Sequence, residues 1–326
     1  MQVTRIGPVF GAEVSDVALT ADLTAEQLSA LTAALARHEV LVFREQHMTA
    51  QQQLEFGRRL GELVVSPFSP NADDAPELIV LDYGVDNKPR TDIWHADETY
   101  RPEPPKITIL KAVISPELGG DTMFCSMRAA YAGLSDRMQR HIAGLTALHG
   151  FGRFQHLVSQ DPARVRLLHE VEMAFPHPNH PVVTVHPETG HKVLYVNRHF
   201  TERINELPED EGRAILEFLL NQTARPEFQL RVAWQPGTIV MWDNRSVQHY
   251  AGHDYWPQRR RMERVTIAGD TPIGDGESAQ VSVQRTPVTD VSLDTSDPDA
   301  GPSLKAPTRE IDRRTDLSRV AQPRRS

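Results

Sequence analysis

The sequence predicts an antiparallel β core with helical buttresses, either a jelly roll or a sandwich. Many short runs rich in β-branched and aromatic residues are separated by turn residues, whereas helical periodicity is confined to the N-terminal part and to one or two insertions. Alternating strand–helix–strand units would place a helix after each strand, and this chain lacks that pattern. A content of 39% hydrophobic and 24% charged residues is that of an ordinary globular protein, so a sizeable core is expected.

Two helices are expected near the N-terminus. Thr24 in TAEQ and Thr49 in TAQQ each begin a segment with capping-box spacing, and apolar residues recur at helical intervals after them. Apolar runs at 40–43 (VLVF) and 77–83 (ELIVLDY) predict strands beside these helices.

The rest of the chain predicts short strands interrupted by helices. Residues 126–149 are expected to be helical, and 151–180 to form a long loop with helical pieces. The remaining expected elements are strands at 106–116, 122–125, 181–187, 192–197, 228–235, 237–244 and 264–270, a GGD turn at 119–121, and a helix at 209–223.

Composition divides the chain into a domain at 1–273 and a polar tail at 274–326. Asp, Ser, Pro and Thr dominate the tail, and its end is basic. Such a segment buries too little apolar surface to fold alone, so it is expected to be disordered.

Charge and cysteine content limit the classes of partner. A net charge of −9 and a pI of about 5.9 argue against nucleic acid or an anionic membrane as partner. A single cysteine, Cys125, excludes an intramolecular disulfide and favours a reducing compartment. No signal-peptide pattern or membrane span is evident, so a cytoplasmic location is expected.

The motif IWHADETY, residues 93–100, places His95 and Asp97 two residues apart. In an extended segment both side chains would point to the same face and could share one metal ion. An isolated H-x-D pair more often lies on a solvated polar face, so a third ligand from a distant strand is required. His249 and His253, in SVQHYAGHDYW, are the candidates.

An arginine cluster follows His249 and runs into the apolar strand VTIAG. Period-2 alternation puts Arg260, Met262 and Arg264 on one face and the residues between them on the other. Guanidinium groups that point inward need anions, and the planar fork fits a carboxylate or a sulfonate. Two histidines and one carboxylate on a β scaffold form the facial triad of non-haem Fe(II) oxygenases.

Several motifs together resemble the taurine dioxygenase (TauD/TfdA) family of Fe(II)- and 2-oxoglutarate-dependent dioxygenases. They are WHADETY (94–100), PP (104–105), GGDT (119–122), HPVVTVHPETGHKVLYVNRHFT (180–201) and the run from RPEFQLRVAWQ to RVTIAGD (225–270). The resemblance covers the chain to about residue 273 and implies a double-stranded β-helix (jelly roll) core.

The resemblance also implies roles for individual residues. His95, Asp97 and His249 match the iron ligands. Thr122 and Arg260 match residues that bind 2-oxoglutarate, the arginine at its distal carboxylate. Two further residues match the substrate side: Arg264 at the substrate's anionic group and the iron-bound end of the cosubstrate, and Phe200 as an aromatic wall.

Four of the residues that hold taurine in taurine dioxygenase are not matched here. Their positions fall on Ser66, Ser69, Thr91 and Phe154, whereas Arg264 is retained. The expected substrate is therefore a small to medium anionic molecule other than taurine, for example an alkyl sulfonate or a sulfate ester.

The expected reaction is hydroxylation with Fe(II) as cofactor and 2-oxoglutarate and O2 as cosubstrates, releasing succinate and CO2. With a sulfonate or sulfate ester, cleavage would follow hydroxylation. A hydroxylase or desaturase of a carboxylate-bearing metabolite is an alternative, as is a zinc-dependent hydrolase or a non-catalytic metal-binding β protein. A homo-oligomer is also expected, because relatives commonly self-associate.

Overall fold

The computed structural model describes residues 1–19, 23–89, 93–151 and 162–275. Residue contacts group Met1–Gln280 and Val281–Ser326 as two units, and every described residue belongs to the first. The expected polar tail lies outside the described residues, apart from Gly274 and Asp275.

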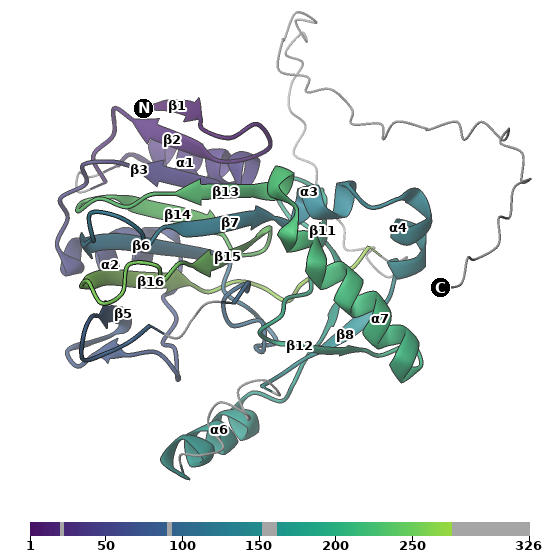
Figure 1. Ribbon diagram of the computed structural model, residues 1–326. Coiled ribbons are helices and arrows are strands. Elements are labelled where there is room, and N and C mark those ends of the chain that lie inside the picture. Colours follow the sequence, from purple (N-terminus) through teal and green to yellow (C-terminus); the bar gives the residue numbers. More distant parts are fainter. Residues whose placement is uncertain (20–22, 90–92, 152–161, 276–326) are drawn as a thin grey trace, which may run out of the picture. The chain divides into compact units, whose positions relative to one another are not determined.

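The largest layer is an eight-stranded sheet (Figure 1). Its strands are β1 (Gln2–Arg5), β2 (Ala12–Ser15), β3 (Val40–Phe43), β4 (Asn71–Ala72), β5 (Ala75–Tyr83), β6 (Ile107–Ile114), β14 (Ile239–Asp243) and β16 (Arg260–Ile267). They lie in the order β1-β2-β3-β14-β6-β16-β5-β4, and every pair is antiparallel except β2 with β3.

A smaller antiparallel sheet packs on one face of the large sheet. It contains β7 (Thr122–Ser126), β13 (Gln229–Val232) and β15 (Val247–Ala251), with β7 in the centre. Side chains from both sheets form one buried apolar cluster, in which Phe124 of β7 meets Trp242 of β14 with ring centroids 5.4 Å apart. The predicted mostly-β core is confirmed.

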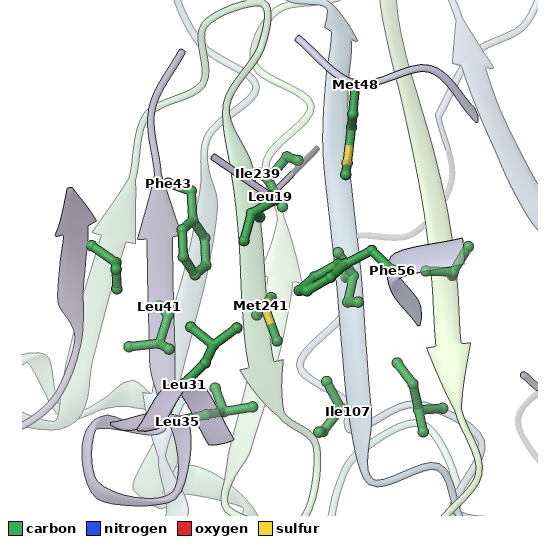
Figure 2. Close-up of a cluster of buried hydrophobic side chains, with 14 of the residues drawn as sticks. Leu19, Leu31, Leu35, Leu41, Phe43, Met48, Phe56, Ile107, Ile239 and Met241 are labelled. Carbon is green, nitrogen blue, oxygen red and sulfur yellow. The ribbon is translucent and has the colours of Figure 1, made fainter. Parts of the chain in front are cut away.

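Two helices, α1 (Ala25–His38) and α2 (Ala50–Leu60), cover the other face of the large sheet. Both predicted capping boxes are present, with Thr24 accepting from the Gln27 amide and Thr49 from the Gln52 amide. Because side chains alternate along a strand, Leu41 points toward these helices while its neighbours point toward the small sheet. Figure 2 shows the apolar layer that results.

The remaining elements lie toward one end of the two sheets (Figure 1). The strands are β8 (Thr146–His149), β9 (Asn179–Pro181) and β12 (Thr201–Ile204) in one sheet, and β10 (Val183–Val185) with β11 (Lys192–Leu194) in another. The helices are α3 (Met127–Ala132), α4 (Asp136–Ile142), α6 (Pro162–Ala174), α7 (Glu209–Leu220) and the 3-10 turns η1 (Asn221–Ala224) and η2 (Pro226–Phe228).

The helical region expected at 126–149 is wrong in part, because it contains two short helices followed by a strand. Ser126 and Ser135 each cap a separate short helix through a side-chain oxygen that accepts from a backbone amide. Gly144, at φ 74°, then turns the chain, and 146–149 is a strand that pairs with β9 and β12.

Candidate active site

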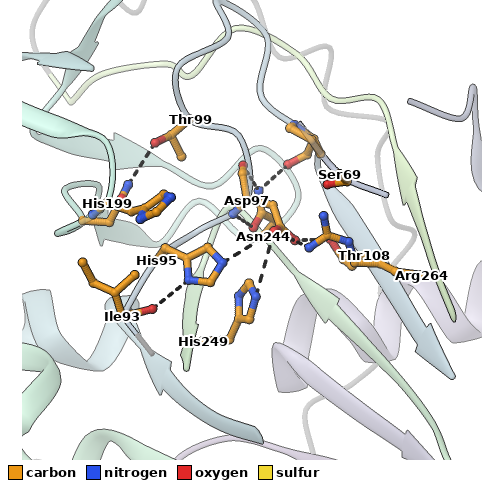
Figure 3. Close-up of polar contacts among 12 residues, drawn as sticks. Ser69, Ile93, His95, Asp97, Thr99, Thr108, His199, Asn244, His249 and Arg264 are labelled. Atoms are coloured by element: carbon orange, nitrogen blue, oxygen red, sulfur yellow. Dashed lines mark hydrogen bonds and ion pairs between the residues drawn. The ribbon is translucent and has the colours of Figure 1, made fainter. Parts of the chain in front are cut away.

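The structure brings the three predicted metal ligands together from two distant parts of the chain. His249 lies on β15, and His95 pairs with it through an isolated antiparallel bridge of two backbone hydrogen bonds. The predicted strand around His95 is thus a single bridge followed directly by a turn at Asp97. Asp97 Oδ1 lies 3.8 Å from His95 Nε2 and 3.9 Å from His249 Nε2 (Figure 3).

Asp97 is held from three sides. Thr108 Oγ1 donates to its Oδ2 at 2.9 Å, and Arg264 Nη1 donates to its Oδ1 at 2.8 Å. Asn244, in the turn before β15, accepts from the Asp97 amide at 2.7 Å and donates to the Asp97 carbonyl at 2.9 Å. A second donation from Asn244 reaches the carbonyl of Pro105, so this one amide joins the segments that carry the ligands.

The protonation states of the triad suit a divalent cation. Burial raises the pKa of Asp97, but Arg264, the two imidazoles and Thr108 outweigh it, and the pKa lies well below the ordinary range. Burial lowers the pKa of both His95 and His249. His95 Nδ1 contacts the Ile93 carbonyl at 2.8 Å, which directs Nε2 toward Asp97. One carboxylate and two neutral imidazoles, all buried, fit Fe(II) in a facial triad.

A cavity of about 410 Å³ opens in front of the triad. Six of the other residues predicted from the sequence line it: Ser66, Ser69, Thr122, Phe200, Arg260 and Arg264. Thr91 and Phe154 lie outside the described residues, so their predicted substrate contacts stay predictions.

Arg260 is a buried cation without a counterion among the described residues. Its side chain is 3% exposed, and neither Nε nor Nη2 has a hydrogen-bond partner there. The guanidinium lies 5.8 Å from the ring centroids of both Trp234 and Tyr255, and burial lowers its pKa. Trp234 Nε1 also donates to Thr122 Oγ1 at 3.0 Å, which places the Thr122 hydroxyl in the same part of the site. An organic carboxylate is the anion that this pocket fits.

Another part of the cavity wall is aromatic. Phe68, Tyr100 and Phe200 line it, and Tyr100 packs at 6.0 Å and 5.3 Å from the rings of the other two. The apolar cluster continues behind this wall with Phe151, Leu168 and Val171 and with the partly buried Phe175. An apolar part of a substrate would be desolvated against this surface.

His199 is a cavity residue that sequence reasoning missed. Its ring lies 5.5 Å from that of His95 (Figure 3). It also lies 4.4 Å from the ring of Phe200. Asn197 Oδ1 accepts from the backbone amides of both His199 and Phe200, which fixes the loop that presents them. Its position next to the predicted Phe200 in NRHFT was the available signal.

A second group of possible ligands, His186, Glu188 and Asp243, is a structural network. Arg245 donates to both carboxylates, at 2.7–2.9 Å for Asp243 and 3.0 Å for Glu188. His186 Nε2 contacts Asp243 Oδ2 at 2.9 Å. Burial raises the pKa of Asp243, but hydrogen bonds from His186 and Arg245 lower it to about 2. The arginine already balances this charge, so the group does not need a cation.

Comparison with known proteins identifies the family. The model of the taurine catabolism dioxygenase TauD, TfdA family matches residues 2–266. The chain belongs to the TauD/TfdA family. It is therefore an oxidoreductase, and the predicted family and enzyme class are confirmed.

The relatives of this TauD/TfdA chain include enzymes of known substrate class. It is 36% identical to an alpha-ketoglutarate-dependent sulfate ester dioxygenase from Pseudomonas putida, over 86% of this chain and 94% of the relative. It is 34% identical to an alkylsulfatase from Acinetobacter baylyi, over 84% of this chain and 87% of the relative.

Solved structures agree with the fold. A taurine dioxygenase from Burkholderia xenovorans superposes with a TM-score of 0.71 at 32% identity, covering 84% of this chain and 93% of that one. The enzyme AAD-2, solved with Mn(II) and N-oxalylglycine, superposes with a TM-score of 0.69 at 28% identity, covering 83% and 98%. The predicted jelly-roll core is confirmed. In the part of the chain that the structure describes, no helix is both long and apolar enough to cross a membrane.

Proposed function

We propose that this protein is an Fe(II)- and 2-oxoglutarate-dependent dioxygenase that hydroxylates a medium-sized alkyl sulfate ester at the carbon bound to the ester oxygen. The observation that carries the proposal is Arg260, a buried guanidinium whose Nε and Nη2 lack partners among the described residues, on the same cavity as a two-histidine, one-carboxylate triad. A hydrolase has no use for this second anion site, whereas 2-oxoglutarate needs both a metal and a cation for its distal carboxylate.

The expected cofactor and cosubstrates, Fe(II), 2-oxoglutarate and O2, are confirmed at the level of the family by the relatives. In this proposal His95, Asp97 and His249 hold the iron, and Arg260 and Thr122 bind the cosubstrate. Iron, when bound, supplies the activation of O2 that couples decarboxylation of 2-oxoglutarate to oxidation of a substrate C–H bond. The protein orients the cosubstrate and one C–H bond and excludes bulk water.

Two features of the cavity support a substrate with an anionic head and an apolar chain. Arg264, which forms an ion pair with Asp97, lines the cavity together with His199 and offers a positive charge to an anionic group. Phe68, Tyr100 and Phe200 offer an apolar wall to the rest of the molecule. The two relatives described above, one named for sulfate esters and one for alkyl sulfate cleavage, favour a sulfate head.

The proposed reaction balances with one O2 per turnover. One oxygen atom enters the substrate as a hydroxyl on the carbon that carries the sulfate, and the other enters succinate as 2-oxoglutarate loses CO2. The hydroxylated carbon then releases sulfate, which leaves with the electron pair of its C–O bond. The hydroxyl gives up its proton and becomes the carbonyl of an aldehyde. Arg264 would hold the sulfate while this bond breaks.

The test is a matched panel of alkyl sulfates, sulfonates and carboxylates of equal chain length, with succinate and sulfate measured together. We expect the sulfates to give equal amounts of the two products, and His95→Ala to give neither. Faster succinate formation with the carboxylates would favour the alternative of a hydroxylase or desaturase of a carboxylate-bearing metabolite. Sulfate release without succinate would contradict the proposal altogether.

Other expectations accompany this proposal. A homo-oligomer, a cytoplasmic location, the absence of a nucleic-acid partner, and substrate contacts from Ser66, Thr91 and Phe154 stay predictions.

A further inference from the structure

We propose that Thr108 is a positioning residue that holds one oxygen of Asp97 away from the metal, so that this carboxylate supplies a single ligand atom. The inference rests on the metal site of the proposed function but not on its substrate. It concerns a residue that neither touches the cavity nor belongs to the triad.

Thr108 is well placed to fix a neighbour. It is fully buried in the middle of the large sheet, on β6, with Trp242 of β14 opposite it on one side and Thr266 of β16 on the other. The pairing of β6 with a strand on each side restrains the backbone at this position, and a β-branched side chain has little rotamer freedom. Its hydroxyl therefore has a nearly fixed position, 2.9 Å from Asp97 Oδ2.

The two oxygens of Asp97 have different surroundings. Oδ1 faces Nε2 of both His95 and His249, at 3.8 Å and 3.9 Å, and accepts from Arg264. Oδ2 accepts from Thr108. Asn244 already holds the Asp97 backbone through its amide and carbonyl, so rotation of the carboxylate is the main remaining freedom. The hydrogen bond from Thr108 to Oδ2 removes this rotational freedom.

This restraint matters for the number of open positions on the metal. A facial triad of two imidazoles and one carboxylate oxygen leaves positions open for the cosubstrate's chelating atoms and for O2. A second oxygen from the same carboxylate would compete with them. Fixing Oδ2 on Thr108 also lowers the ordering cost of binding the metal, because the ligand is oriented in advance.

The experiment compares Thr108→Val, which removes the hydroxyl at similar volume, with Thr108→Ser, which keeps it. Thr266→Val is the matched control, because Thr266 is equally buried and lies directly opposite on β16. Fe(II) binding is measured without O2 or substrate, by competition with a chromogenic chelator. The temperature is well below the unfolding midpoint of each metal-free variant, so that a loss of fold is not counted as a loss of affinity.

Removal of a hydrogen bond that orients a metal ligand typically costs about 10–100-fold in metal affinity. We expect a loss in that range for Thr108→Val and a Kd within about threefold of the unaltered protein for Thr108→Ser and Thr266→Val. An affinity of Thr108→Val within about threefold would overturn the inference, as would an equal loss in Thr266→Val. Should Thr108→Val not fold, Thr108→Ala carries the same test. Because no substrate is present, a failure of the sulfate ester proposal would leave this result unaffected.

Discussion

Arg260 is expected to lower the stability of the metal-free protein while making cosubstrate binding possible. Two of its donors are buried without partners among the described residues, and each unsatisfied buried donor costs about 1–3 kcal/mol. Contacts with Trp234 and Tyr255 offset part of this cost, by about 0.5–2 kcal/mol. Arg260→Met should therefore raise the free energy of unfolding by about 2 kcal/mol, which corresponds to an increase in Tm of about 4 °C for a domain of this size.

The same variant should bind 2-oxoglutarate poorly. Loss of two charge-assisted hydrogen bonds to a carboxylate, each worth about 1.5–3 kcal/mol, predicts an increase in KM for 2-oxoglutarate of about 100-fold or more. The assays are thermal unfolding without metal or cosubstrate, and succinate formation against 2-oxoglutarate concentration.

Arg261→Met is the control for Arg260→Met. Arg261 is adjacent, but it is about one-third exposed and pairs with Asp82 at 3.2 Å and Glu263 at 3.5 Å. Replacing Arg261 should leave the Tm equal to or lower than that of the unaltered protein, because exposed ion pairs contribute little to stability. The KM for 2-oxoglutarate should stay within about threefold of the value for the unaltered protein. If Arg260→Met instead melted lower and kept its KM, the reasoning about an unpartnered guanidinium would be refuted.

Three further changes test the surroundings of the site. Gly120→Ala places a Cβ 3.1 Å from Arg260 Cδ, at a backbone φ of 72° that favours glycine. Because the Cβ would displace the arginine, the KM for 2-oxoglutarate should rise about tenfold. An unchanged KM would mean that cosubstrate binding does not depend on the exact position of Arg260. Asn244→Asp removes two hydrogen bonds to backbone carbonyls, so the free energy of unfolding, measured by denaturant titration, should fall by about 2–3 kcal/mol. A change below about 0.5 kcal/mol would contradict the role of Asn244 in joining these segments. Asp243 has a folded pKa of about 2, below its unfolded value, so its stabilisation is complete above about pH 4 and is lost as pH falls toward 2. Asp243→Asn should therefore be less stable at pH 7 and lose less stability than the unaltered protein between pH 5 and 2.5, and parallel pH profiles would argue against this.

Local sequence signals predicted the elements whose formation depends on nearby residues. The capping boxes at Thr24 and Thr49 are of this kind, because donor and acceptor lie within one helical turn. Alternation along 260–264 likewise predicted that Arg260 and Arg264 share a face, and the structure places both on the cavity. The helical region expected at 126–149 was wrong in part because Gly144 and strand pairing of 146–149 outweighed the local propensity.

The residues that support the site were not predictable from local pattern. Thr108 and Asn244 act on Asp97 across 11 and 147 positions of the chain, through contacts that exist only once β6 and the turn before β15 are in place. His199 gave no periodic signal, because its position depends on a loop held by Asn197. Motif resemblance, rather than periodicity, predicted that His95, Asp97 and His249 form one metal site.

The most direct test of the central claim is the stoichiometry of one reaction, in which the purified protein is supplied with Fe(II), 2-oxoglutarate, O2 and a medium-chain alkyl sulfate. We predict one succinate for each sulfate released and neither product in Asp97→Asn. The Arg261→Met control should form both products, with a KM for 2-oxoglutarate within about threefold of that of the unaltered protein. Sulfate release that persists without 2-oxoglutarate, or in Asp97→Asn, would contradict the central claim.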